Sequence, residues 1–352
     1  MGMVASWVNV GGRASPYLYS QLEAIILDWS TQTVLITGGT GSFGRAFVSY
    51  LQAHHPPKKL IVFSRDEFKQ FEMSKVHHEP NMRYFLGDVK DLGRLKRACA
   101  GVDYIVHAAA LKQVPACEYN PFEAIKTNVH GAQNVIDAAI ENGVRKTVAL
   151  STDKAVSPAN LYGATKLCAE KVFTAGNAYV SASADTRFSI VRYGNVMGSR
   201  GSVVPVFLAQ RKTGVLPITD VRMTRFWITL HQGVQMVVSS IEKMRGGEIF
   251  IPKIPSLKVV DLARAIAPEC KHEVIGIRPG EKLHELLISE EEMGHTMEFD
   301  DSFVIEPNFE WFESSRSNGK SVVDKHVYSS ETNDNWLSVE QLGSMLEQEK
   351  VL

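Results

Sequence analysis

Four residues with proton-transfer chemistry lie in one short segment, residues 151–166, which reads STDKAVSPANLYGATK. Asp153 and Lys154 are adjacent, and Tyr162 and Lys166 follow at a spacing of four residues. If the segment is helical, that spacing places the tyrosine and the second lysine on one face. A carboxylic acid, two amines and a phenol together suit a reaction that moves several protons.

The Tyr162–Lys166 pair has the composition of a base for a redox step. A phenol has a pKa of about 10, so it is a poor base at neutral pH. An ammonium nearby stabilises the phenolate and lowers that pKa. If a helix begins near Asn160, Lys166 can do this for Tyr162, which then takes a proton from a substrate hydroxyl as hydride leaves the same carbon. We therefore predict that both residues are catalytic and contact the cofactor.

A glycine-rich turn between an apolar run and a helical run predicts a dinucleotide site. The stretch VLITGGTGSFGRAF places three glycines at a strand-to-helix junction. Glycine permits a tight turn and close approach of backbone N–H groups to a pyrophosphate, which the helix N-terminus also attracts. The predicted cofactor contacts of this turn are Gly38, Thr40, Gly41, Ser42, Phe43 and Gly44.

The end of the second strand, in IVFSRDEFKQ, distinguishes between the two nicotinamide cofactors. A carboxylate there would receive ribose hydroxyls, whereas Ser64 followed by Arg65 suits a ribose phosphate. Lys69 lies one helical turn further, so these residues favour NADP over NAD. Asp88, after the third strand, is either an adenine contact or the cap of the next helix. Further predicted cofactor contacts follow the third and fourth strands: Val89, Ala108 and Ala109.

The elements that must position these residues alternate along the chain. Short apolar runs predict strands over residues 33–39, 59–65, 82–88, 103–110, 146–152 and 188–195. Helical spacing is clear over residues 44–54 and 131–143. Such alternation predicts an α/β fold of the Rossmann type, with a doubly wound parallel sheet covered by helices on both faces.

The pattern changes after residue 195, where Gly and Pro become frequent and predict a smaller, loop-rich part. Ser338 and Gln341 form a capping box, which predicts one late helix. We expect an N-terminal extension over residues 1–30 that is either helical or non-native. An NADP-binding Rossmann domain over 31–194 follows, and then a mostly substrate-binding part over 195–352 with some segments returning to the Rossmann domain.

The composition disfavours a nucleic-acid-binding protein, a membrane protein and a disulfide-rich protein. The 352 residues include 38 basic and 39 acidic residues, so no global field favours nucleic acid. The longest apolar run near the N-terminus, AIIL, is too short to span a bilayer. Four cysteines without metal spacing or a disulfide framework are typical of a reduced, cytoplasmic protein. We expect no metal, no nucleic-acid partner and no membrane segment.

Several motifs together resemble a known family. TGGTGSFG, HAAA, TNVHGAQNV and YGATK are similar to extended short-chain dehydrogenases/reductases that act on nucleotide sugars, from about residue 31 almost to the end. SRDEFKQ, AALKQVP, RYGNVMGSRGSVVP, MTRFWIT, IGIRPGEKLHE and ISEEE more closely resemble the soluble, inverting UDP-N-acetylglucosamine 4,6-dehydratases of pseudaminic-acid-type pathways. Tyr162 fits this branch, because the retaining, membrane-attached relatives tend to have methionine there.

The resemblance implies a dehydration that gives a UDP-4-keto-6-deoxy-L-arabino-hexosulose. Carbon 4 is transiently oxidised, water is eliminated across carbons 5 and 6, hydride returns to carbon 6, and carbon 5 is reprotonated from the opposite face. We assign Lys154 as the base for the carbon 5 proton and Asp153 as the acid for the carbon 6 oxygen, although the opposite assignment stays open. The base needs a lowered pKa and the acid a raised one, which a strong ion pair between them would oppose.

The resemblance also implies contacts with UDP-N-acetylglucosamine, from Lys154, Asn195, Arg200, Arg225, Arg278 and Glu281. Glu281 would hold ribose hydroxyls or an arginine, and Lys112 either lines the sugar pocket or starts a helix. Relatives of this type are dimers or larger rings, so we expect a homo-oligomer, either a dimer or a hexamer. Two alternatives are a UDP-sugar epimerase of the same family and a non-catalytic cofactor-binding regulator.

Overall fold

The structure is a computed structural model that describes residues 27–181, 183–199, 201–309, 319–322 and 327–349. The predicted N-terminal extension therefore lies outside the described residues, except for residues 27–30. A short 3₁₀ helix, Trp29–Thr31, leads into the fold. The Trp29 ring packs against Tyr104 and His55, so the described chain is joined to the core from this point on.

Six parallel strands form the sheet that the sequence predicts. They are adjacent in the order β3-β2-β1-β4-β5-β6, so the chain starts in the middle and extends outward in both directions. Their bounds are β1 (Thr33–Thr37), β2 (Lys59–Ser64), β3 (Met82–Leu86), β4 (Tyr104–His107), β5 (Lys146–Thr152) and β6 (Arg187–Tyr193). The prediction of a doubly wound α/β fold is confirmed.

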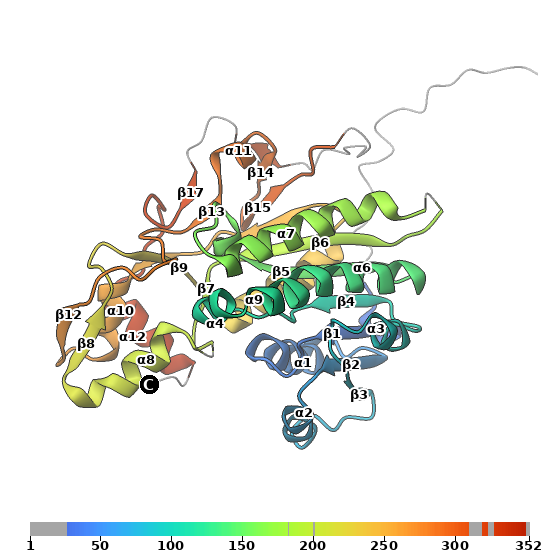
Figure 1. The fold of residues 1–352 in the computed structure, drawn as a ribbon, viewed down its shortest axis with the longest axis horizontal. Coiled ribbons are helices and arrows are strands. Elements are labelled where there is room, and N and C mark those ends of the chain that lie inside the picture. The colour runs from blue at the N-terminus through green and yellow to red at the C-terminus, as the bar shows by residue number, and fades with distance from the viewer. Residues whose placement is uncertain (1–26, 182, 200, 310–318, 323–326, 350–352) are drawn as a thin grey trace, which may run out of the picture.

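Two groups of helices cover this sheet (Figure 1). In the first group, α1 (Ser42–His54) packs against α9 (Leu230–Lys243), which also contacts β5 and β6. In the second, α6 (Gly131–Glu141) contacts both α3 (Leu92–Ala98) and α7 (Leu161–Gly176), and α7 lies on β5 and β6. Right-handed crossovers in opposite directions from the central strand place the two groups on opposite faces.

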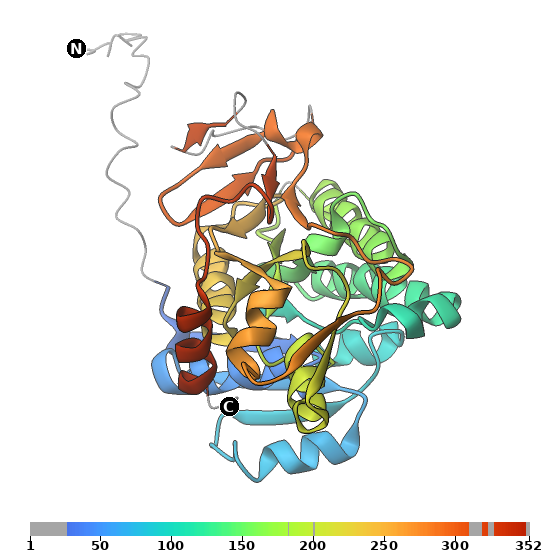
Figure 2. The same ribbon diagram turned by 90° about the vertical axis from the view of Figure 1, so that its left-hand side faces the viewer.

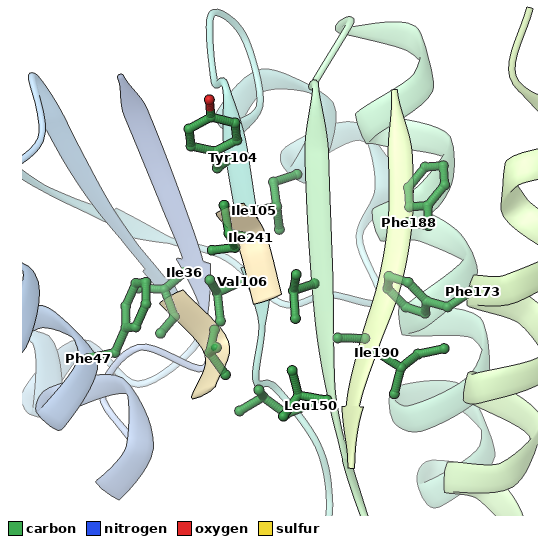
Figure 3. Packing of buried hydrophobic residues seen from close by; sticks show 14 of the residues in the cluster. Ile36, Phe47, Tyr104, Ile105, Val106, Leu150, Phe173, Phe188, Ile190 and Ile241 are labelled. Carbon is green, nitrogen blue, oxygen red and sulfur yellow. The ribbon is translucent and has the colours of Figure 1, made fainter. Parts of the chain in front are cut away.

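The core between helices and strands is apolar and closely packed. Figure 3 shows Phe47 of α1, Ile241 of α9 and Phe173 of α7 approaching the strands, and all three side chains are fully buried. His107 at the end of β4 stacks on Phe173, and its Nδ1 lies 2.8 Å from Thr37 Oγ1. Burial lowers the pKa of His107 to about 3, so this imidazole is neutral.

Segments from late in the chain extend the large sheet. β10 (Ile249–Pro252) pairs in parallel with β6. Three antiparallel strands continue beyond it: β15 (Ser302–Ile305), β14 (Thr296–Glu298) and β16 (Lys320–Ser321). The helix before β10, α9, begins at a capping box between Thr229 and Gln232. The sequence interpretation missed α9, so the region after residue 195 is more regular than its Gly and Pro content indicates.

A second hydrophobic cluster lies beside the sheet, and its fully buried members include Val204, Leu257 and Leu342. The elements around it are α8 (Val203–Gln210), β8 (Val215–Ile218), α10 (Val259–Ile266), β12 (Lys271–Val274) and α12 (Val339–Gln348). Figure 2 shows α10 beside α12, which is drawn in dark red. α12 begins at the predicted capping box, because Ser338 Oγ accepts a hydrogen bond from Gln341 N.

The remaining described α-helices and strands are α2 (Glu67–Ser74), α4 (Val114–Tyr119), α5 (Pro121–Ile125), β7 (Asn195–Val196), β9 (Thr224–Ile228), β11 (Ser256–Lys258), β13 (Leu286–Ile288), α11 (Glu290–Met293) and β17 (Tyr328–Ser329). A π-helix covers Lys126–His130, and single-turn 3₁₀ helices cover Asp153–Ala155, Asn177–Tyr179 and Arg211–Thr213. Within the described ranges, no helix combines the length and the apolar character needed to cross a bilayer.

A buried ion cluster fixes the late segments to the sheet. Arg192 on β6 donates to Glu170 of α7 at 2.7 and 3.0 Å, and to Glu292 of α11 at 2.8 and 2.9 Å. Burial disfavours the cation, but the two carboxylates outweigh burial and raise the pKa of Arg192. Removing one member of such a cluster typically costs about 3–5 kcal/mol, because a buried charge is left without a partner. The cluster therefore fixes α7 relative to the C-terminal segments.

Candidate active site

A cavity of about 600 Å³ opens where the parallel strands end. Open α/β sheets bind ligands at this carboxyl edge. All of the predicted cofactor contacts line the cavity, namely Gly38, Thr40, Gly41, Ser42, Phe43, Gly44, Ser64, Arg65, Lys69, Asp88, Val89, Ala108, Ala109, Tyr162 and Lys166. Three of the predicted substrate contacts line it as well: Lys112, Lys154 and Asn195. The structure thus brings most of the predicted site residues into one space.

The glycine turn between β1 and α1 has the geometry of a pyrophosphate cradle. Gly38 has a φ of +65°, and a Cβ there would lie 2.8 Å from the backbone of Ala109. A Cβ on Gly44 would lie 2.4 Å from Gly39, so side chains are excluded at both positions. Gly41 is the N-cap of α1 and supplies no side-chain cap, which leaves the helix N-terminus open to an anion. The turn therefore fits the phosphates of a dinucleotide.

Ser64 and Arg65 lie at the end of β2 and Lys69 lies in the first turn of α2, where the adenosine ribose of a dinucleotide is expected. Ser64 is buried, and its hydroxyl accepts from Thr40 Oγ1 at 3.3 Å. The Arg65 side chain is 59% exposed, with Nη1 3.7 Å from Asp88 Oδ2, so its guanidinium is free to turn toward a ligand. Lys69 forms an ion pair with Asp66. The two cations can neutralise a ribose phosphate here.

Asp88 does not cap the next helix, which corrects one of its two predicted alternatives. The N-cap of α3 is Asp91, whose Oδ1 accepts from Arg94 N. Asp88 Oδ1 instead accepts from Lys90 N at 3.0 Å within the preceding turn. Asp88 lines the cavity, so its position is compatible with the adenine contact.

Tyr162 and Lys166 lie on the first turns of α7, as their spacing predicts. The helix begins after Asn160, whose Oδ1 accepts from Gly163 N at 2.8 Å. Lys166 is buried, and its Nζ donates to the Leu150 carbonyl at 2.7 Å. This bond fixes the ammonium between α7 and β5, at the wall of the cavity.

The pKa of Tyr162 is raised, whereas the sequence predicts that Lys166 lowers it. Burial lowers the pKa of Lys166 to about 8, and Glu170 partly offsets that effect. Burial raises the pKa of Tyr162 to about 12, while Lys154 acts to lower it and Asp153 to raise it. The cation that acts to lower the pKa of the phenol is Lys154, a residue that the sequence assigned to another step.

Asp153 and Lys154 form a short 3₁₀ turn directly after β5, Asp153–Ala155. Lys154 Nζ donates to Asp153 Oδ1 at 2.9 Å, and Thr152 Oγ1 donates to the same oxygen at 2.9 Å. Asp153 Oδ2 is buried without a hydrogen-bond partner among the described residues. Lys154 lines the cavity, whereas Asp153 is fully buried behind it. The two neighbours therefore have different access to a ligand.

The pKa values of Asp153 and Lys154 are both raised, but for different reasons. Burial raises the pKa of Asp153, and this effect exceeds the opposing influence of Lys154. Burial acts to lower the pKa of Lys154, but Asp153 and Glu285 outweigh it and raise that pKa above its ordinary value. The raised pKa of Asp153 has the direction that an acid needs, whereas the raised pKa of Lys154 is opposite to the direction that a base needs.

Glu285 is a site residue that the sequence reasoning missed. It precedes β13, is 2% exposed, and places Oε1 3.5 Å from Lys154 Nζ. The quoted motif IGIRPGEKLHE contains it, and an acidic residue next to the apolar run LLI was the available signal. Lys282 from the same motif lies 3.4 Å from Glu285 Oε2. A buried carboxylate from the C-terminal part thus reaches the Asp153–Lys154 turn.

The predicted substrate contacts divide into two groups. Asn195 on β7 and Lys112 lie in the cavity, where Asn195 Oδ1 is buried without a partner among the described residues. Lys112 Nζ lies 3.5 Å from Ser199 Oγ, and burial together with Lys154 lowers its pKa. Lys112 precedes α4 without being part of it, since that helix starts at Val114.

The arginines are placed differently from the prediction. Arg225 is buried and does not line the cavity, and its guanidinium donates to the carbonyls of Thr224, Lys282 and Leu283 at 2.6, 3.0 and 3.1 Å. Arg278 is exposed, and neither it nor Glu281 lines the cavity. Asn160 Nδ2 donates to the neighbouring Gly280 carbonyl at 2.8 Å, so this loop lies beside the start of α7. Arg200 lies outside the described residues.

Comparison with known proteins identifies relatives along most of the chain. A family model described as "Polysaccharide biosynthesis protein" matches residues 34–307. "UDP-N-acetylglucosamine 4,6-dehydratase (inverting)" of Campylobacter jejuni is 53% identical over 324 residues, 89% of this chain and 97% of its own length. "UDP-glucose 4-epimerase" of Rickettsia conorii is 45% identical over 282 residues, 78% of this chain and 82% of its own.

Solved structures share the fold. Pen from Bacillus thuringiensis has a TM-score of 0.85 at 38% identity, covering 93% of this chain and all of its own. DesIV, a dTDP-glucose 4,6-dehydratase from Streptomyces venezuelae with NAD and TYD bound, has a TM-score of 0.65 at 25% identity. That match covers 71% of this chain and 86% of DesIV.

Proposed function

The chain belongs to the polysaccharide biosynthesis protein family, and from this premise we propose that it is a UDP-N-acetylglucosamine 4,6-dehydratase that inverts carbon 5. The observation that carries the proposal is the Asp153–Lys154 pair beside Tyr162 and Lys166 at one cavity. The first pair suits elimination and the second suits oxidation. The similarity to the Campylobacter jejuni protein supports the same substrate.

The cofactor of this proposal is a nicotinamide dinucleotide, and we favour NADP. The turn from Gly38 to Gly44 would hold the pyrophosphate, and Ser64, Arg65 and Lys69 would receive the ribose phosphate. When bound, this group accepts hydride from carbon 4 of the sugar and returns it at carbon 6. The glycine positions that exclude a Cβ are the structural support for its binding there.

Tyr162 carries the first proton transfer in the proposed reaction. Its phenolate would take the proton of the carbon 4 hydroxyl, so that a ketone forms at that carbon. Because burial raises the pKa of Tyr162 to about 12, the phenolate needs cations around it. Lys154 already acts in this direction, and Lys166 lies one helical turn away as a second ammonium.

Asp153 and Lys154 carry the elimination. A proton passing from Lys154 to Asp153 along their 2.9 Å hydrogen bond would turn the ion pair into a neutral amine and a carboxylic acid. The amine then takes the carbon 5 proton, which the carbon 4 ketone makes acidic. The acid protonates the carbon 6 oxygen as the C6–O bond breaks and water leaves. The pair returns to its charged form. Carbon 5 then regains a proton from solvent on the opposite face, and Tyr162 releases to solvent the proton that it took at carbon 4.

The lysine faces the cavity, so it would meet the substrate before the buried aspartic acid does. Asp153 Oδ2 has no hydrogen-bond partner among the described residues, so this oxygen would carry the proton that is donated. The proton that it carries is favoured by burial, which raises its pKa. This difference in access supports the assignment of Lys154 as the base and Asp153 as the acid.

The residues proposed to bind the substrate are supported either by their position in the structure or by resemblance alone. Asn195 and Lys112 line the cavity and would contact the diphosphate and the sugar. Arg200, Arg278 and Glu281 remain substrate contacts by resemblance. Arg225 would act indirectly, because its guanidinium is bonded to backbone carbonyls. We also propose a homo-oligomer in the cytoplasm, by the same resemblance.

A second candidate is a UDP-sugar epimerase, which the similarity to the Rickettsia conorii protein favours. Tyr162 and Lys166 alone would suffice for that reaction, whereas Asp153 and Lys154 would have no chemical step in it. A regulator without catalysis is the third alternative. It is disfavoured because Lys154, Tyr162 and Lys166 line one cavity and Asp153 lies directly behind it.

The deciding experiment is product analysis after incubation with UDP-N-acetylglucosamine in deuterated water. A product that has lost the carbon 6 hydroxyl and carries deuterium at carbon 5 in the inverted configuration supports the proposal. An epimer that keeps its carbon 6 hydroxyl identifies the second candidate. Unchanged sugar with tightly bound cofactor identifies the regulator.

A further inference from the structure

Glu285 is a buried carboxylate beside the proposed catalytic pair, and the mechanism above gives it no role. Its backbone is fixed by Ser330, because Glu285 N donates to Ser330 Oγ at 2.9 Å and Ser330 N donates to the Glu285 carbonyl at 2.8 Å. The side chain, 2% exposed, reaches the turn that carries Lys154. A charged group this deeply buried needs partners, and those partners indicate its function.

Three cations surround the Glu285 carboxylate. Oε1 lies 3.5 Å from Lys154 Nζ and 3.9 Å from Arg225 Nε, and Oε2 lies 3.4 Å from Lys282 Nζ. Lys282 Nζ also donates to the Val156 carbonyl at 2.6 Å, and Arg225 donates to three backbone carbonyls. Of these three cations, Lys154 alone lines the cavity. The ion pair with Glu285 therefore connects a fixed internal cluster to the group that faces the ligand.

The Lys154 ammonium lies between two carboxylates that are not equivalent. Asp153 Oδ1 is 2.9 Å away and Glu285 Oε1 is 3.5 Å away. Burial raises the pKa of Asp153, and the negative charge of Glu285 adds to that effect. Burial also acts against the charge of Glu285, but Lys154, Arg225 and Lys282 outweigh it and lower the pKa of Glu285. Glu285 thus stays ionised under conditions in which Asp153 can hold a proton.

We propose that Glu285 is a positioning residue for the dehydration. It holds the Lys154 side chain at the cavity wall, and it supplies a fixed negative charge next to the proton that Asp153 carries. This inference rests on the proposed function and adds no group that touches the substrate. No bond to Glu285 forms or breaks, because the proton moves between Lys154 and Asp153. Glu285 keeps its charge through the cycle.

Besides Glu285, other titratable or charged groups face the Asp153–Lys154 pair and act on its electrostatics. They come from several elements: Lys112 after β4, Tyr162 on α7, Arg225 on β9, and Lys282 before β13. Replacing Glu285 by a neutral residue removes one negative charge from this set. Protons on both Asp153 and Lys154 are then held less tightly, so both groups release them at lower pH.

The test is the pH dependence of kcat for water loss in the Glu285→Gln variant. We expect kcat to fall about 10-fold or more, KM to change less than about 3-fold, and both limbs of the profile to move to lower pH. Glu248→Gln is the matched control, since Glu248 is a buried carboxylate that binds Ser189 Oγ and Gly246 N and does not line the cavity. A Glu285→Gln profile with unmoved limbs, like that of the control, would overturn the inference.

Glu285→Asp provides a second test that does not depend on how well Glu285→Gln folds. This variant keeps the charge but shortens the side chain, so the limbs should stay at the wild-type pH while kcat falls. A kcat equal to that of the wild type would show that the reach to Lys154 is unimportant and would contradict the proposal.

A third measurement separates this inference from the proposed function. If the wild-type protein removes no water from UDP-N-acetylglucosamine, the proposed function fails. The Lys154 pKa can still be followed by NMR of carbon-13-methylated lysines, with Lys154→Arg used for assignment. A lower Lys154 pKa in Glu285→Gln supports the coupling, and an unchanged one refutes it.

Discussion

The backbone carbonyl of Lys154 lies where a Cβ on Gly163 would be only 2.1 Å away. Gly163 is in the first turn of α7, between Tyr162 and Lys166, so the turn that carries the elimination pair rests directly on the helix that carries the redox pair. This close approach requires glycine. It fixes the distance between the two pairs of proposed catalytic groups.

Gly163→Ala should therefore lower the dehydration rate sharply, because the added methyl must push the Lys154 turn away from α7. We expect kcat to fall about 100-fold, in line with small misplacements of reacting groups. Gly233→Ala in α9 is the control, since a Cβ there meets nothing within 4 Å. That variant should keep its activity and be slightly more stable. Wild-type kcat in Gly163→Ala would show that the contact does not set the site geometry.

Neutral replacements of the elimination pair should separate cofactor binding from water loss. In Lys154→Ala and Asp153→Asn, we expect dehydration to fall about 100- to 10,000-fold, as for loss of a general acid or base. Cofactor affinity, measured by fluorescence of the reduced nicotinamide, should stay close to that of the wild type. Dehydration at the wild-type rate in Lys154→Ala would remove this residue from the mechanism.

Lys166 should make stability depend on alkaline pH. Its pKa is about 8 in the folded state and 10.5 ordinarily, so below pH 8 both states hold the proton and stability is insensitive to it. Between those values only the unfolded state keeps the proton, and the free energy of unfolding rises with pH. Relative to Lys166→Met, the wild type should gain up to about 3 kcal/mol across this window. Urea unfolding at several pH values measures this difference, and a constant difference would contradict it.

Arg65 should contribute to the choice between NADP and NAD. Arg65→Ala removes a cation from the end of β2, so we expect the NADP dissociation constant to rise about 10-fold while that for NAD changes little. Arg97→Ala, an exposed arginine of α3 outside the cavity lining, is the control. Titrations of both variants with both cofactors provide the measurement. Equal losses of affinity for NADP and NAD in Arg65→Ala would mean that Arg65 does not recognise the ribose phosphate.

The parallel sheet and the dinucleotide turn were predictable because their signals are local. Six apolar runs and the spacing of Gly38, Gly41 and Gly44 each depend on neighbours in the sequence. Helix α7 was predictable for the same reason, since Asn160 caps it and Tyr162 and Lys166 share one face. These features follow from the spacing of apolar residues along the chain and from the residues that turns and helix caps require.

The remainder of the site depends on contacts between distant parts of the chain. Glu285 and Lys154 are far apart in the sequence, and only the packing of β13 on the Asp153–Lys154 turn brings them to 3.5 Å. Arg225 was predicted as a substrate contact, but its guanidinium donates to three backbone carbonyls around it. Side-chain partners of this kind are set by tertiary packing, which a single sequence does not reveal.

The late position of Glu285 along the chain has a consequence for biosynthesis. A ribosome completes strands β1 to β6 and α7 well before it adds residue 285, and N-terminal units generally fold first. A nascent chain can therefore form its glycine turn and place Tyr162 while Lys154 still lacks its second carboxylate. In each newly made molecule, the cradle for a dinucleotide and the charged cluster at the elimination pair are completed at different times.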